Sequence, residues 1–179
     1  MMNNKMLLVI LIILLSSNFN GCLNKSSYIG YSIYVTPTQG SETILIVPLV
    51  MDKNSGEIAS VMNVKPKFSK GNADLEIINT DKGPAMKIIT NEEIVVRFTK
   101  DYKENGAELR QNRILSMTNT THDEIATSWA YFNSTKNQTT FFWITLRAGD
   151  DKKQLFEISG RNISNGWNQF NVKKGIEIV

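Results

Sequence analysis

The sequence has very few of the side chains that usually carry catalysis, redox chemistry or metal binding. Among 179 residues there is one cysteine, Cys22, and one histidine, His122. A lone cysteine excludes an intramolecular disulfide, a Cys-x-x-Cys centre and a zinc site built from several cysteines. Any serine–histidine–acid triad would have to use His122, and no Gly-x-Ser-x-Gly motif accompanies it. We therefore predict a non-enzymatic protein with no metal site and no cofactor.

A strong excess of one charge is also missing. The chain carries 20 basic and 17 acidic side chains, scattered along its length. A nucleic-acid-binding domain typically gathers Lys and Arg on one face, and a polybasic membrane patch gathers them in one short segment. Neither pattern is present, so nucleic acid is not an expected partner.

The sequence has no apolar run long enough to cross a membrane, which takes about 20 residues. Its most apolar stretch is Met6–Leu15, preceded by the single charge of Lys5 and followed by small and polar residues up to Gly21. A cationic start, a short apolar run and a small-residue exit are typical of a secretory signal peptide. We predict that residues 1–21 are such a signal.

The end of this signal, in the stretch "SSNFNGCLN", contains the only cysteine. Gly21 and Cys22 resemble the lipobox of prokaryotic lipoproteins, whereas Phe19 and Asn20 depart from its usual residues. The resemblance implies a diacylglyceryl group on Cys22, a tether over residues 22–27, and a location on the outer face of the cytoplasmic membrane. Two alternatives stay open, namely an uncleaved signal anchor and ordinary cleavage nearby.

Residues 28–179 consist of short β-rich runs separated by turn-forming residues, which predicts a single all-β domain. We expect an antiparallel β-sandwich, Ig-like or jelly-roll-like, because no long helical repeat interrupts the runs. Short helices are expected only within Ile58–Val64 and Tyr102–Gln111. The expected strands are Tyr28–Val35, Thr43–Met51, Leu75–Asn79, Ala85–Thr90, Glu93–Lys100, Arg113–Thr118, Glu124–Asn133, Thr139–Arg147, Gln154–Ser159, Trp167–Val172 and Ile176–Val179.

Two hairpins can be predicted locally. The first turns at Asp81-Lys82-Gly83, where Gly83 supplies a positive φ. The second turns over residues 134–138 and joins two strands with aromatic residues at alternate positions. If its strands pair, one face carries Ala, Phe, Ile and Leu, and the other carries an aromatic ladder. The ladder consists of Trp129, Tyr131, Phe141 and Trp143. If it is exposed, it is a candidate ligand-binding surface; if it is covered, it is part of the core.

Two further resemblances concern the body of the chain. The C-terminal "NGWNQFNVKKGIEIV" resembles the closing strands of β-sandwich carbohydrate-binding modules, and "YSIYV", "TILIVPL" and "DKGPAMKI" are similar to segments of archaeal surface lipoproteins with all-β domains. The second resemblance implies a location and a fold but no activity. Export would also make N-glycosylation relevant. The candidate acceptors in Asn-x-Ser/Thr sequences are Asn24, Asn119, Asn133, Asn137 and Asn162.

The sequence favours a non-enzymatic domain held at the cell surface by a lipid on Cys22. It would bind or support some component of the cell envelope. The alternative is a module that binds a glycan or an envelope protein through the aromatic ladder. An envelope hydrolase is the least favoured function, because it would require His122 or a pair of acids in a pocket.

Overall fold

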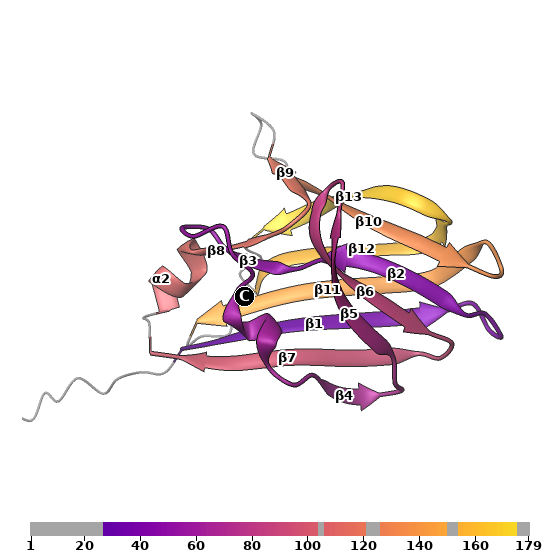
Figure 1. Cartoon of the computed structure of the whole chain (residues 1–179), viewed down its shortest axis with the longest axis horizontal. Coiled ribbons are helices and arrows are strands. Elements are labelled where there is room, and N and C mark those ends of the chain that lie inside the picture. Colours follow the sequence, from indigo (N-terminus) through magenta and orange to yellow (C-terminus); the bar gives the residue numbers. More distant parts are fainter. Residues whose placement is uncertain (1–26, 104–105, 121–125, 150–153, 175–179) are drawn as a thin grey trace, which may run out of the picture.

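A computed structural model describes residues 27–103, 106–120, 126–149 and 154–174 (Figure 1). Cys22, Asn24, His122 and the expected strand Ile176–Val179 lie outside these ranges. Within the described ranges, no helix has the length and apolar character needed to cross a bilayer.

Nearly all of the described chain is β-structure, as the sequence predicts. All strand pairs are antiparallel. The strands are β1 (Ser27–Pro37), β2 (Thr43–Pro48), β3 (Val50–Asp52), β4 (Lys67–Lys70), β5 (Asp74–Thr80), β6 (Gly83–Thr90), β7 (Ile94–Tyr102), β8 (Arg113–Leu115), β9 (Thr118–Thr120), β10 (Ala126–Ser134), β11 (Gln138–Gly149), β12 (Gln154–Ser164) and β13 (Gly166–Lys174).

Eleven of these strands form one sheet that curls into a half-barrel (Figure 1). Ten of them lie in the order β4-β7-β1-β11-β12-β13-β10-β2-β6-β5, and β9 pairs with β10 off this path. Strands β3 and β8 form a separate two-stranded sheet. The expectation of two stacked sheets is thus replaced by one continuous sheet whose halves face each other.

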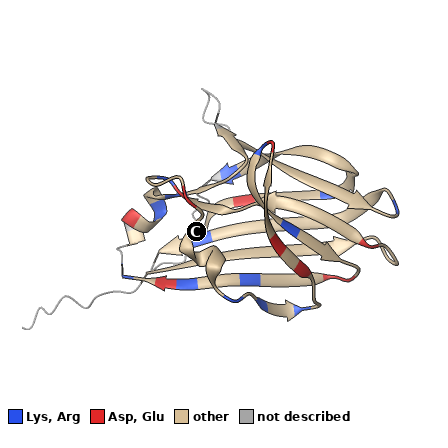
Figure 2. Cartoon of the chain, in the orientation of Figure 1, with Lys and Arg blue, Asp and Glu red and all other residues tan. Residues whose placement is uncertain are grey.

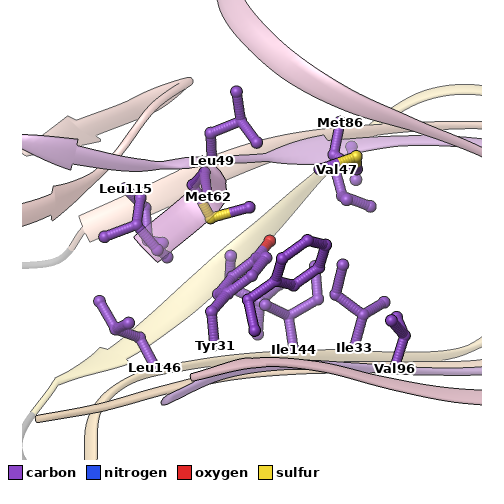
Figure 3. Close-up of a cluster of buried hydrophobic side chains, with 14 of the residues drawn as sticks. Tyr31, Ile33, Val47, Leu49, Met62, Met86, Val96, Leu115, Ile144 and Leu146 are labelled. Carbon is purple, nitrogen blue, oxygen red and sulfur yellow. The ribbon is translucent and has the colours of Figure 1, made fainter. Parts of the chain in front are cut away.

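Alternating burial along the strands explains why this sequence curls around a core. In β1 every second residue is buried, in the pattern predicted by its alternating apolar positions. Figure 3 shows Tyr31 and Ile33 of β1 on one side of the core and Val47 and Met86 of the opposite half on the other. The Tyr31 hydroxyl crosses this space and donates a hydrogen bond to the Pro48 carbonyl oxygen. Its burial raises the pKa of the Tyr31 phenol far above the ordinary value.

The backbone pairing between β12 and β13 is the sparsest along the ten-strand order of the sheet. These strands pair at only two positions, near Phe156 and Glu157. Farther along, the Phe170 ring fills the gap, and a Cβ on Gly160 would lie 2.7 Å from that ring. Phe170 also packs edge-on against Phe142, with ring centroids 4.8 Å apart. The absence of a side chain at Gly160 therefore lets an aromatic ring occupy the corner of the half-barrel.

The predicted hairpin between β10 and β11 does not form. β11 pairs with β1 and β12, whereas β10 pairs with β13 and β2. The two strands belong to opposite halves of the curled sheet, and Phe132 of β10 meets Phe142 of β11 across the core, with centroids 5.0 Å apart. A tight connection between two strands normally favours their pairing. Here both phenylalanines are buried because the two strands face each other across the core, and the strands are not neighbours in the sheet.

Other local predictions are confirmed. The β5–β6 hairpin forms, with Thr80 opposite Gly83 and a φ of 115° at Gly83. Its loop is one residue shorter than predicted. The short helices are also present, as the 3-10 helix η1 (Ser60–Asn63) and the helix α2 (Gly106–Gln111). Strand β4 was not predicted, because its four residues are mostly exposed and polar.

Candidate binding surface

The outer face of β10 and β13 carries a group of half-buried aromatic side chains. Tyr131 lies opposite Trp167 in the strand register, and Trp129 lies opposite Gln169. The Tyr131 and Trp167 rings meet edge-to-face with centroids 5.5 Å apart. Along β10, Trp129 and Tyr131 alternate with the buried residues Ser128, Ala130 and Phe132. The two-residue period of a strand therefore places the Trp129 and Tyr131 rings on the outer side.

The β5–β6 turn places a cation over this aromatic group. The Lys82 ammonium lies 4.5 Å from the centroid of the Trp129 ring and 5.3 Å from that of Trp167. Asp81 also contacts this ammonium, with an oxygen–nitrogen distance of 3.5 Å. An ammonium over an indole face is attracted by the electron-rich ring. Lys82 therefore holds the two indoles and the hairpin tip together in one surface.

A polar hollow of about 350 Å³ opens beside Trp129. Its walls include Asp81 and Lys82 from the β5–β6 turn and Thr118 and Asn119 from β9. The turn before β9 is fixed against β10, because the Met117 carbonyl accepts hydrogen bonds from the Trp129 backbone N–H and the Ser128 hydroxyl. Met117 itself has a φ of 54°, the left-handed conformation of a tight turn.

The chemistry of this surface suits a ligand that is both apolar and rich in hydroxyl groups. Indole rings offer flat faces for apolar contacts, and Asp81, Asn119 and Thr118 offer hydrogen-bond acceptors and donors. A pocket with one aromatic wall and a few converging polar groups fixes the orientation of a small ligand. A pyranose ring has this combination of C–H faces and hydroxyl edges.

A second aromatic group lies on the outer face of β1 and β11. The rings of Tyr34 and Phe141 have centroids 5.4 Å apart, and the Arg161 guanidinium lies 5.7 Å from the Phe141 ring. The Tyr34 hydroxyl donates to Glu93 at 2.7 Å, and Lys70 forms an ion pair with the same carboxylate at 2.6 Å. The hydrogen bonds from Lys70 and then Tyr34 hold the pKa of Glu93 below its ordinary value.

Trp143, also on this second surface, is tied to the neighbouring strand. Burial acts to raise the pKa of Glu157, but hydrogen bonds from Gln154, Lys173 and Trp143 outweigh it and leave the pKa below its ordinary value. Gln154 and Lys173 donate hydrogen bonds to the Glu157 carboxylate at 3.0 Å and 3.3 Å. The charged and aromatic side chains here contact one another.

The four residues predicted as one ladder therefore occupy two surfaces. All four are half-buried on the outer face of the sheet, as the alternation predicts. However, Trp129 and Tyr131 lie with Trp167 on one half, whereas Phe141 and Trp143 lie with Tyr34 on the other. Because the inner faces of β10 and β11 oppose each other, these two surfaces point away from each other.

Sequence reasoning missed the partners that complete the first surface. The sequence predicts Trp167 only as part of a C-terminal strand pattern and Lys82 only as a turn residue. The register of β13 beside β10 and the reach of the β5–β6 turn depend on strand order, which local sequence patterns do not determine. The sequence predicts Asn119 only as a glycosylation acceptor and Trp129 only as part of the ladder, and it does not predict that the two border one hollow.

The candidate glycosylation asparagines in the described ranges are all exposed, namely Asn119, Asn133, Asn137 and Asn162. The Asn165 amide donates hydrogen bonds to the side-chain oxygens of Asn133 and Asn137, at 3.3 Å and 3.2 Å. Asn119 instead lines the hollow beside Trp129.

Among the described residues, no group of three or more His, Cys, Asp or Glu side chains has the geometry to hold a metal ion. Comparisons with protein-family models, with curated proteins and with solved structures return no match for this chain.

Proposed function

We propose that this chain is a non-enzymatic, lipid-anchored protein of the cell surface that binds a glycan through the Trp129 surface. We define this surface as Trp129, Tyr131, Trp167, Lys82 and the adjoining hollow. The observation that carries the proposal is the Lys82 ammonium held over two indole rings at the edge of a polar hollow. Aromatic rings beside amide, hydroxyl and carboxylate groups are the chemistry that a sugar ring requires.

The anchor rests on the sequence. The signal-like residues 1–21 and the Gly21-Cys22 pair support export followed by lipidation of Cys22. A single acyl chain binds a membrane only marginally, whereas the two chains of a diacylglyceryl group make anchoring stable. The domain would then present the Trp129 surface to glycans or glycosylated proteins of the envelope.

Glycan binding is tested by screening the purified full-length protein, in detergent micelles, on an array of surface polysaccharides and glycoprotein glycans. Glycans bound on the array are then titrated while tryptophan fluorescence is followed. We expect Trp129→Ala to weaken binding at least about tenfold, which corresponds to about 1.4 kcal/mol. Loss of one stacking face removes most of the apolar contact with a sugar ring.

Trp143→Ala is the matched control, because it removes a half-buried tryptophan from the opposite surface. It should leave glycan affinity unchanged. Equal losses in both variants, or no glycan binding by the wild-type protein, would refute the proposed function.

The anchor is tested separately by partition into detergent. The wild-type protein from its native cells should enter the detergent phase of a Triton X-114 separation, and metabolic labelling should place fatty acid on it. Cys22→Ser should lose the label. Retention of the label in that variant would exclude Cys22 as the attachment site.

A further inference from the structure

The curled sheet ends in two edge strands, β4 and β5, whose outer sides pair with no strand among the described residues. Every second residue of an edge strand turns its backbone N–H and C=O toward the open side, where they can pair with another strand. Natural proteins usually block such edges with short length, bulges or lysines. The two edges of this sheet differ in how far they are blocked.

Strand β4 has all three forms of protection. It spans four residues, its register with β7 shifts between Phe68 and Lys70, and two of its residues are lysines. In Figure 2 this edge is marked by basic positions, whereas β5 carries acidic ones. An additional strand is therefore not expected to pair with β4.

Strand β5 has less of this protection, which is limited to the exposed carboxylates of Asp74 and Glu76. Its seven residues pair with β6 without a register shift, and it contains neither proline nor lysine. Ile77, at its midpoint, is 42% exposed, the most of any large apolar side chain in the described ranges. Ile77 and Leu75 face the inner side of the sheet, where they line an apolar groove of about 430 Å³ closed on its other wall by Val64 and Pro66. The edge thus offers both unpaired backbone and exposed apolar surface.

We propose that β5 pairs with β5 of a second copy of this chain, antiparallel and centred on Ile77. A centre at Ile77 is the register that uses all seven residues, because it sets Asp74 opposite the partner's Thr80. It also sets Glu76 opposite the partner's Ile78, so that no carboxylate lies directly opposite another. A shift of the centre to Glu76 would place two carboxylates opposite each other, which destabilises a strand pair.

This pairing also accounts for the exposed apolar surface. Opposite residues of an antiparallel pair point to the same side of the sheet. The two copies of Ile77 would therefore lie together on the inner side, next to the groove that each copy forms with Val64 and Pro66. The contact is the same on both copies, which is the isologous arrangement of a twofold-symmetric dimer, the commonest oligomer.

Disulfide trapping tests the register. The full-length chain carries Cys22→Ser, so that an introduced cysteine is the only thiol, and is oxidised in detergent micelles. In the proposed pair the two copies of residue 77 are about 5.5 Å apart or closer between Cα atoms, within the range that a disulfide spans. Ile77→Cys should therefore form a covalent dimer at least about tenfold faster than the controls, whose thiols cannot meet without backbone movement.

Two variants serve as controls for this experiment. Asn79→Cys lies on the same edge, but its two copies would be about 13 Å apart along the strands. Ile114→Cys replaces the other exposed large apolar residue of the described ranges, which lies on β8 and is 40% exposed. Equal rates in all three variants, or the fastest rate at residue 79 or 114, would overturn the proposal.

Sedimentation equilibrium in density-matched detergent gives a second test that needs no cysteine. The wild-type chain should show a dimer that weakens with dilution, and Ile77→Lys should shift it to monomer, whereas Ile114→Lys should not. Circular dichroism confirms that each variant is folded. A wild-type protein that stays monomeric at every concentration would contradict self-pairing, as would dissociation caused equally by both lysine variants. A monomer that still binds glycan would leave the proposed function intact.

Discussion

The inner and outer faces of β10 and β11 are built from similar residues but have different roles. On the inner face, Phe132 and Phe142 are fully buried and pack against each other. On the outer face, Trp129 and Trp143 are half-buried, and the Lys82 ammonium lies over the Trp129 ring. Aromatic content alone therefore does not distinguish core from surface in this protein. What distinguishes them is the parity of each position along its strand.

The largest expected effect comes from emptying the inner face. Phe142→Ala removes a ring that packs against both Phe132 and Phe170, and large-to-small changes of this kind cost about 3–5 kcal/mol. Phe141→Ala, one residue away on the outer face, should cost about 1 kcal/mol because its ring keeps partial contact with solvent. Urea denaturation of both variants measures the difference. Equal losses would mean that the two faces are not distinct.

A smaller loss of stability is expected from adding a side-chain atom at Gly160, where the Phe170 ring leaves no room for it. Gly160→Ala places a methyl group 2.7 Å from an atom of the Phe170 ring. Overpacking of this kind costs about 1–3 kcal/mol.

The double variant Gly160→Ala/Phe170→Leu should lose less stability than the sum of the two single losses, because a leucine side chain is smaller than the ring and leaves room for the new methyl group. Additive losses in thermal denaturation would show that the two residues do not share this corner.

The sequence predicts which residues share a face of a strand, but it does not predict which strands are neighbours in the sheet. Alternation along β10 and β11 correctly separated Phe132 and Phe142 from Trp129 and Trp143, but it left open whether the tryptophan face was exposed or covered. The short connection between these strands suggested pairing, but strands β12 and β13 separate them in the sheet. The choice between adjacent and facing strands depends on how the whole sheet curls, through contacts such as Phe170 over Gly160, and no local pattern encodes it.

The candidate site was only half predictable for the same reason. Trp129 and Tyr131 follow from their aromatic character and parity. Lys82 and Asn119 join them through the β5–β6 turn and β9, which are brought to β10 by tertiary structure. The all-antiparallel β character, by contrast, follows from short alternating runs separated by turn residues and was predicted correctly.

A partly buried and an exposed ion pair can be compared in the same way as the two faces. A moderate, pH-dependent loss of stability is expected when the partly buried Arg113–Asp52 pair is broken. Arg113 is 5% exposed and donates a hydrogen bond to Asp52 at 2.7 Å. Hydrogen bonds from the backbone N–H of Ser55, then of Asn54, and the charge of Arg113 hold the pKa of Asp52 below its ordinary value despite some burial. Because Asp52 is partly exposed, Asp52→Asn should cost about 1 kcal/mol at neutral pH.

The pH dependence of this variant follows from the sign of the shift. A carboxyl group with a depressed pKa in the folded state contributes stability above its unfolded pKa of about 3.9, and this stability is lost as the pH falls through the folded value. The difference in melting temperature between wild type and Asp52→Asn should therefore be largest near pH 7 and disappear in acid. Glu93→Gln, on the outer face, should show a smaller difference at pH 7. A difference for Asp52→Asn that grows toward low pH would contradict this assignment.

The smallest effect is expected at the Trp129 surface itself. Lys82→Gln removes the ammonium over two indole rings, a contact worth about 0.5–1 kcal/mol when the cation is partly exposed, and Lys82 is 24% exposed. Lys82→Arg should retain most of this stability, since a guanidinium also stacks on indole. Chemical denaturation followed by circular dichroism compares the three proteins. A loss in Lys82→Gln as large as that of Phe142→Ala would mean that the outer indoles act as core, and that the surface is closed to a ligand. A small loss, rescued by arginine, would instead mean that Lys82 contributes to the Trp129 surface as a partly exposed cation, as the proposed function requires.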